Sequence, residues 1–121
     1  MRVLTLPYKG IVTKDYLRDN PDVIFVFGDN VIRKGLGGAA ALRNHPQAYG
    51  FITKKYPDYR DTSYYIPEDY EEIYKHEMLT LQWHIKAQPK KIFLISKLGS
   101  GLANKFNIYE KVIEPRIKND L

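Results

Sequence analysis

Two apolar runs, each followed by a glycine-rich segment, constrain the fold of this chain more than any other feature. The first run is Val23–Phe27 and the second is Ile92–Ser96. Continuous β-branched and aromatic runs of this length are typical of parallel strands that are covered on both faces. Ligands of open α/β sheets bind outside the carboxyl ends of such strands. The sequence therefore predicts that the two segments form opposite walls of one cleft for a phosphate-bearing ligand.

The first glycine-rich segment combines polar side chains with accessible backbone. Asp29 and Asn30 stand at the strand end, where a carboxylate and an amide can contact ribose hydroxyls or a base edge. A helix expected over residues 37–44 would direct free N–H groups and the positive end of its dipole toward the same place. The residues expected to bind the ligand are Gly28, Asp29, Asn30, Gly35, Gly37, Gly38 and Ala39.

The second glycine-rich segment follows the second strand. Gly99 and Gly101 flank Ser100, and backbone of this kind can form a nest of N–H groups around a phosphate. The residues expected to bind the ligand here are Gly99, Ser100, Gly101 and Leu102. For either segment alone, an ordinary strand-to-helix turn is an equally good interpretation. Ligand binding is nevertheless the favoured interpretation of the two segments together, because each of them follows a strand at an equivalent place in the topology.

Strand and helix patterns alternate along the rest of the chain. The clearest is an apolar stripe at helical spacing over residues 68–87, and Pro115 is expected to kink or split the last helix. Strands are expected over residues 3–6, 23–27, 49–53, 63–66 and 92–96, and helices over 13–21, 37–44, 68–87 and 108–118. The length of 121 residues predicts one domain spanning residues 1–121. Its expected class is α/β, a three-layer α/β/α domain with a mixed central sheet.

Composition and spacing exclude several kinds of function. With no cysteine, the chain has no disulfide or thiolate site, and a cytoplasmic location is expected. No stretch is apolar enough to span a membrane, and no signal peptide is evident. His76 and His84 are eight residues apart, whereas a zinc-binding HExxH helix places its histidines four apart, so neither a metal nor a cofactor is expected. The net charge of +5 suits an anionic ligand or nucleic acid.

The two loops resemble the ligand loops of the macrodomain family, which binds ADP-ribose. The first macrodomain loop combines an Asn or Asp at a strand end with a glycine-rich, alanine-containing helix start. The residues that match it are Asp29, Asn30, Gly35, Gly37, Gly38, Ala39 and Ala40. Ile95–Leu102 is similar to the second loop, which wraps the diphosphate, particularly in the subfamily that removes terminal ADP-ribose from acidic side chains. The chain also resembles small macro-like proteins of bacteria and their phages, which implies a bacterial or host cytoplasm.

The resemblance implies catalytic roles for two residues. Tyr49–Lys54 is similar to the segment of that subfamily that carries a reactive lysine, so Lys54 is expected to form an imine with the opened ribose. The family's second loop runs on into a catalytic aspartate, where this chain has Ala103. Asp29 is the expected substitute, because it should face the same cleft and could activate the anomeric carbon or a water.

Three functions follow from these observations. The first is binding of ADP-ribose or a related nucleotide diphosphate, with or without weak ADP-ribosyl hydrolase activity. The second is a basic nucleotide- or RNA-end-binding module without catalysis, suggested by the charge and by ten tyrosines that could stack on bases. The third is a small α/β domain that acts through protein contacts.

Overall fold

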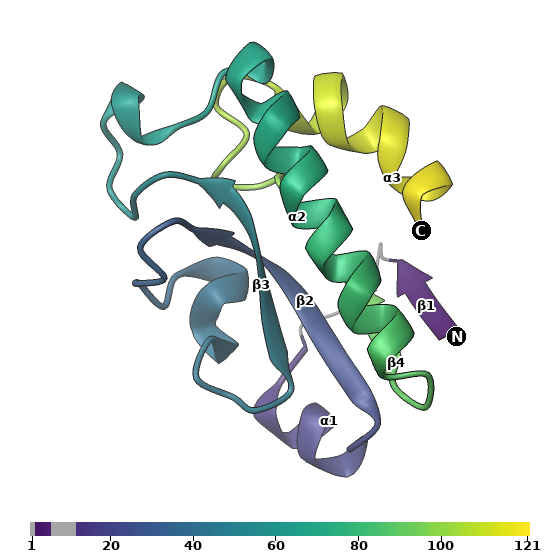
Figure 1. Cartoon of the computed structure of the whole chain (residues 1–121). Coiled ribbons are helices and arrows are strands. Elements are labelled where there is room, and N and C mark those ends of the chain that lie inside the picture. Colours follow the sequence, from purple (N-terminus) through teal and green to yellow (C-terminus); the bar gives the residue numbers. More distant parts are fainter. Residues whose placement is uncertain (1, 6–11) are drawn as a thin grey trace.

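A parallel sheet forms the centre of the molecule (Figure 1). The computed structural model describes residues 2–5 and 12–121. The described sheet has the order β1-β4-β2-β3, and each of its strand pairs is parallel. Its strands are β1 (Arg2–Thr5), β2 (Val23–Asn30), β3 (Ala48–Lys54) and β4 (Ile92–Ile95). The α/β class is confirmed, but the mixed sheet is wrong for the described strands, because the one antiparallel contact is an isolated bridge between Lys54 and Tyr64.

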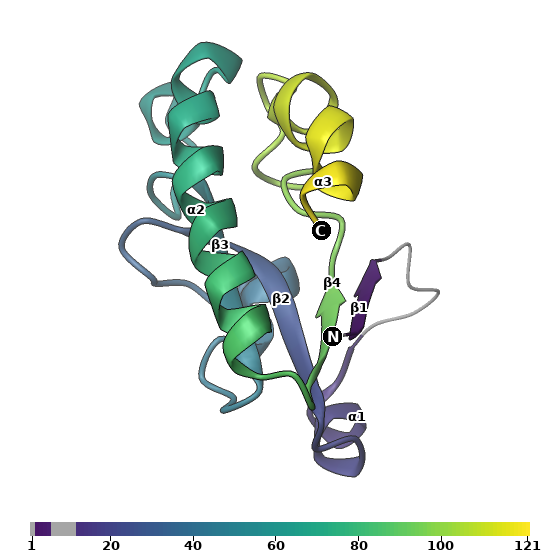
Figure 2. The same ribbon diagram turned by 45° about the vertical axis from the view of Figure 1, so that its right-hand side comes forward.

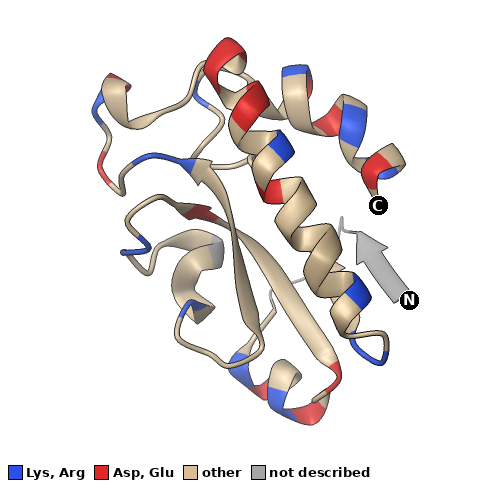
Figure 3. Ribbon diagram, viewed as in Figure 1, with Lys and Arg blue, Asp and Glu red and all other residues tan. Residues whose placement is uncertain are grey.

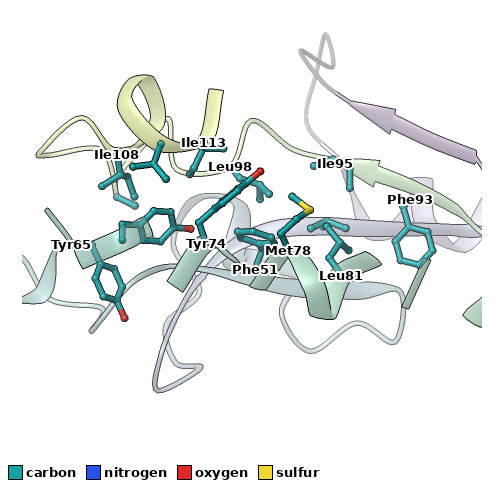
Figure 4. Packing of buried hydrophobic residues seen from close by; sticks show 14 of the residues in the cluster. Phe51, Tyr65, Tyr74, Met78, Leu81, Phe93, Ile95, Leu98, Ile108 and Ile113 are labelled. Carbon is teal, nitrogen blue, oxygen red and sulfur yellow. The ribbon is translucent and has the colours of Figure 1, made fainter. Parts of the chain in front are cut away.

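One face of the sheet is covered by the longest helix and the carboxyl-terminal helical segment (Figures 1 and 2). These are α2 (Pro67–Ala87), a π-helical turn η3 (Tyr109–Ile113) and α3 (Glu114–Asp120). Their apolar side chains meet those of the strands in a core that includes Phe51, Tyr74, Met78, Leu81, Phe93 and Ile113 (Figure 4). This core fixes the sheet beneath α2, as the apolar stripe predicts.

A second cluster of buried side chains lies on the other side of β2. It joins Leu17 of α1 (Lys14–Asp19) and Leu42 of η1 (Gly38–Leu42) to Phe25 and Phe27. Val26 of the same strand belongs instead to the core under α2, because successive side chains of a strand point to opposite faces. The expected burial of this strand on both faces is therefore confirmed.

The helix ends follow local sequence signals. Thr13 caps α1, where its hydroxyl accepts a hydrogen bond from the Tyr16 amide at 3.0 Å. Proline stands in the first turn of α2, where its missing N–H costs nothing. Pro115 likewise stands in the first turn of α3, directly after η3. The backbone stays helical through Ile113 and Glu114, so the last helix changes from π to α geometry there and is not split. Within the described residues, no helix has both the length and the apolar character needed to cross a lipid bilayer.

Two expected elements differ in the structure. The helix over residues 37–44 is instead the five-residue 3₁₀ element η1. It begins at Gly38, whose φ of +57° lies outside the helical region, so regular α-helical backbone cannot start there. The strand over residues 63–66 is instead the turn η2 (Asp61–Ser63) followed by the single bridging residue Tyr64. The first strand is observed, but Leu6, its expected last residue, lies outside the described residues.

Candidate functional site: a cleft between two glycine-rich loops

A cleft of about 470 Å³ opens where β2 and β4 end. Its walls come from the end of β2, both glycine-rich segments, the end of β3 and the turn that follows it. The lining includes these residues expected to bind a ligand: Gly28, Asp29, Asn30, Gly35, Gly37, Gly38, Gly99, Ser100, Gly101 and Leu102. Ala39 lies in η1 between the lining residues Gly38 and Ala40. The structure thus brings both loops to one cleft, and their role in binding stays a prediction.

Asp29 is a buried carboxylate held by two arginines. Its side chain is 2% exposed, and its Oδ2 lies 3.0 Å from Nη1 of Arg33. Its Oδ1 accepts hydrogen bonds from Nη1 of Arg43 and from the Asn30 amide. Both oxygens therefore already have donors, and this pairing accounts for a carboxylate at such low exposure. The role of Asp29 in activating a water or the anomeric carbon stays a prediction.

Arg43 is a cleft residue that sequence reasoning missed. Its Nε donates to the Gly35 carbonyl at 3.1 Å, and its Nη2 donates to the Lys34 carbonyl at 3.0 Å. The guanidinium also lies over the ring of Phe27, 5.6 Å from the centroid. One side chain therefore ties the first loop to the end of β2. A sequence signal does exist, because a buried aspartate at a strand end needs a cation, and Arg43 follows the glycine-rich segment.

The first loop has a fixed backbone conformation. Asn30 Nδ2 donates to the Lys34 carbonyl at 2.7 Å, which closes the turn. Arg33 and Gly35 adopt the left-handed region, with φ of +57° and +93°. The side chain of Asn30 is expected to contact ribose hydroxyls or a base edge, but its Nδ2 already donates a hydrogen bond within the loop. A loop held in this way is preorganised for a ligand, which reduces the entropy lost on binding.

The second loop turns tightly at Lys97–Ser100. The Ser100 amide and hydroxyl both donate to the Lys97 carbonyl, the hydroxyl at 2.6 Å. Gly99 has a φ of +77°, and a Cβ atom there would stand 2.6 Å from Cδ1 of Ile113. The amides of Gly99, Gly101 and Leu102 donate no hydrogen bond to a described residue. These N–H groups are the ones that an anion in the cleft could accept from.

Lys54 reaches the cleft from the end of β3. The residue is 8% exposed, and its Nζ donates to the Asp58 carbonyl at 2.6 Å. The ammonium also lies over the rings of Tyr64, at 4.5 Å, and Tyr59, at 5.1 Å. Burial lowers the pKa of Lys54 below its usual 10.5, and the charge of Asp58 partly opposes this. A lysine in this setting is more readily deprotonated than one on the surface, as a nucleophilic amine must be.

The lining carries more positive than negative side chains. Its charged residues are Lys34, Arg43, Lys54, Lys97 and Asp29. Because Asp29 is already paired with two arginines, the remaining cations favour an anionic ligand. Basic positions are visible at the end of β3, whereas acidic ones gather at the first turns of α2 (Figure 3). Across the described part of the chain, no three His, Cys, Asp or Glu side chains come together as a metal site would require.

The comparison with known families corrects one expectation. The family model that matches covers residues 7–106 and describes a family of unknown function, DUF7831. No macrodomain model matches, so the expected membership of the macrodomain family is wrong. The resemblance to macrodomains rested on short glycine-dominated loops, and such loops also occur in unrelated phosphate-binding turns. No curated protein and no solved structure matches the chain. The chain belongs to the DUF7831 family.

Proposed function

We propose that the cleft binds a nucleotide diphosphate of the ADP-ribose class. The observation that carries this proposal is the convergence on one cleft of free loop amides and of three lysines, Lys34, Lys54 and Lys97, besides the paired Arg43. The volume of about 470 Å³ lies within the range of small-molecule sites. The exposed ring of Tyr59 at the rim offers a face on which a base can stack.

Calorimetry with a ligand series tests this proposal. ADP-ribose and ADP should bind more tightly than AMP, because the second phosphate is the group that the two loops would hold. Ribose 5-phosphate should bind more weakly than AMP, because it lacks the base. Equal affinities for all four ligands, or no heat at about millimolar ligand, would count against the proposal.

A second candidate is a module that binds the end of an RNA. Tyr59 is 72% exposed beside Lys54, an arrangement suited to stacking a terminal base near its phosphate. Several phosphate contacts would make the affinity fall steeply with salt. A short RNA that outcompetes ADP-ribose, with a steep salt dependence, would favour this candidate, and a flat salt dependence would exclude it.

A catalytic version of the first proposal uses the amine of Lys54. The neutral amine would attack the anomeric carbon of an ADP-ribosylated acidic side chain, displace the carboxylate, and form an imine as the ribose opens. Water would then release ADP-ribose and restore the lysine. Release of ADP-ribose from a modified protein should fall to background in Lys54→Ala, and Asp29→Ala tests the second expected catalytic residue. Background release in the wild type would exclude the catalytic version alone.

Two further expectations belong with this proposal. A three-layer arrangement would make α1 and η1 the second helical layer, and the buried contacts of Leu17 and Leu42 support it. A cytoplasmic location is expected from the sequence.

A further inference from the structure

A buried carboxylate of α2 reaches the edge strand β3 close to the cleft. Glu77 is 8% exposed, and its Oε1 accepts a hydrogen bond from the Ile52 amide at 2.6 Å. The fully buried Tyr70 donates its hydroxyl to the Ile52 carbonyl, also at 2.6 Å. The two residues are seven positions apart in the sequence, so both lie on one face of the helix. One residue of β3 thus has both backbone groups bound by α2.

The same stretch of β3 carries a break in its pairing with β2. Asp29 pairs with Ile52, but Asn30 pairs with Lys54, so the register shifts by one residue. A bulge of this kind leaves backbone groups without ladder partners and re-aims the residues that follow. The bonds from Glu77 and Tyr70 hold the residue on the amino-terminal side of the shift. Beyond it, the Lys54 carbonyl accepts from the Val31 amide at 3.1 Å.

The carboxylate at this helix–strand contact has no other evident purpose. An apolar side chain in its place would leave the Ile52 amide without this acceptor. Burial and, next, the negative charge of Glu77 raise the pKa of Tyr49, Tyr65 and Tyr70, so this charge acts on three phenols. Its recorded hydrogen bond is the one to Ile52.

We propose that Glu77 and Tyr70 are positioning residues that hold the bulged end of β3 and thereby keep Lys54 inside the cleft. The significance of this placement for ligand binding rests on the proposed function, but the placement itself does not. If the two bonds are lost, the end of β3 relaxes and the Lys54 amine moves toward solvent. Tyr70→Phe keeps its ring in the core under α2, so this variant is expected to keep the fold.

Competitive labelling of the amines with trace acetic anhydride, read by mass spectrometry across pH, tests the placement without any ligand. In Glu77→Ala and in Tyr70→Phe, the apparent pKa of Lys54 should rise toward 10.5, the value of a solvated lysine. Glu77→Gln keeps an oxygen acceptor for the Ile52 amide, so the pKa of Lys54 should equal that in the wild type. Tyr74→Phe is the matched control, because it removes a similar bond from α2, to Asp120 at 2.8 Å, away from β3.

Calorimetry with ADP-ribose on the same variants separates the two proposals. The affinity should fall about threefold to tenfold in Glu77→Ala and Tyr70→Phe, as expected for a lost hydrogen bond. If the wild type does not bind ADP-ribose but the pKa of Lys54 still rises in the two variants, the proposed function fails and the positioning role stands. If the pKa of Lys54 in folded Tyr70→Phe and in Glu77→Ala equals that in the wild type, the positioning role is overturned. Should Glu77→Ala not fold, Tyr70→Phe decides alone.

Discussion

The interaction between Asp29 and Arg43 is the residue-scale feature on which the first loop depends. Arg43 donates to two loop carbonyls as well as to the carboxylate, whereas a lysine offers a single charged group without the planar fork. We therefore expect Arg43→Lys to lower the free energy of unfolding by about 2 to 3 kcal/mol. Urea denaturation measures this loss.

Arg33→Lys is the matched control for that variant. Arg33 also contacts Asp29, but its side chain is 49% exposed, so its replacement should cost less than about 1 kcal/mol. Equal losses in the two variants would show that the loop does not depend on Arg43 in particular.

Sequence reasoning found most of the cleft at this scale but not what holds it. The glycines and Asp29 were identifiable because strand ends and glycine-rich turns leave local signals. Arg43 was missed, because the need of a buried aspartate for a cation does not tell which cation it is until η1 folds back on the end of β2. Asp29 was identified for its chemistry, whereas the structure pairs both of its oxygens with donors.

At the scale of elements, the second loop depends on close contact with η3. A Cβ atom at Gly99 would stand 2.6 Å from Cδ1 of Ile113, so the Ile113 side chain would have to move, and the φ of Gly99 is +77°. Gly99→Ala should therefore lower the free energy of unfolding by about 2 to 4 kcal/mol, through left-handed strain and overpacking.

Gly101→Ala serves as the control in the same denaturation experiment. No atom lies within 4 Å of a Cβ placed at Gly101, so the change should stay within about 0.5 kcal/mol. If both alanine variants are equally stable, the loop does not pack on η3 in the way described.

Elements with strong periodicity were predictable, and elements governed by contacts were not. The apolar stripe of α2 and the run in β2 each encode their own structure. The η1 segment resembles a helix in sequence, but it forms a five-residue 3₁₀ element that begins at Gly38, where φ is positive. The π-helical turn η3 carries no signal that distinguishes it from an α-helix.

At the scale of the whole molecule, the raised pKa values of two tyrosines predict a loss of stability at high pH. Burial raises the pKa of Tyr49 to about 12 and the pKa of Tyr70 well above 10. In the unfolded chain these phenols lose their protons near pH 10, so the unfolded state binds fewer protons than the native state above that pH. Stability should therefore fall as the pH rises above about 10.

Melting temperatures from about pH 8 to about pH 11 measure this dependence. Tyr70→Phe should make the fall shallower, because it removes one phenol that must stay protonated in the native state. An identical fall in the variant would assign the alkaline loss to other groups.

The most direct test of the central claim is a charge series at Gly101, measured by calorimetry with ADP-ribose. Gly101 lines the cleft, and a Cβ atom placed there meets no atom within 4 Å, so the series replaces it by Glu, Gln and Lys. Gly101→Glu should weaken binding about fivefold or more relative to Gly101→Gln, and Gly101→Lys should strengthen it, because a charge near the diphosphate contributes about 1 kcal/mol or more. Equal affinities across the three variants would contradict the claim that an anionic ligand lies between the two glycine-rich loops.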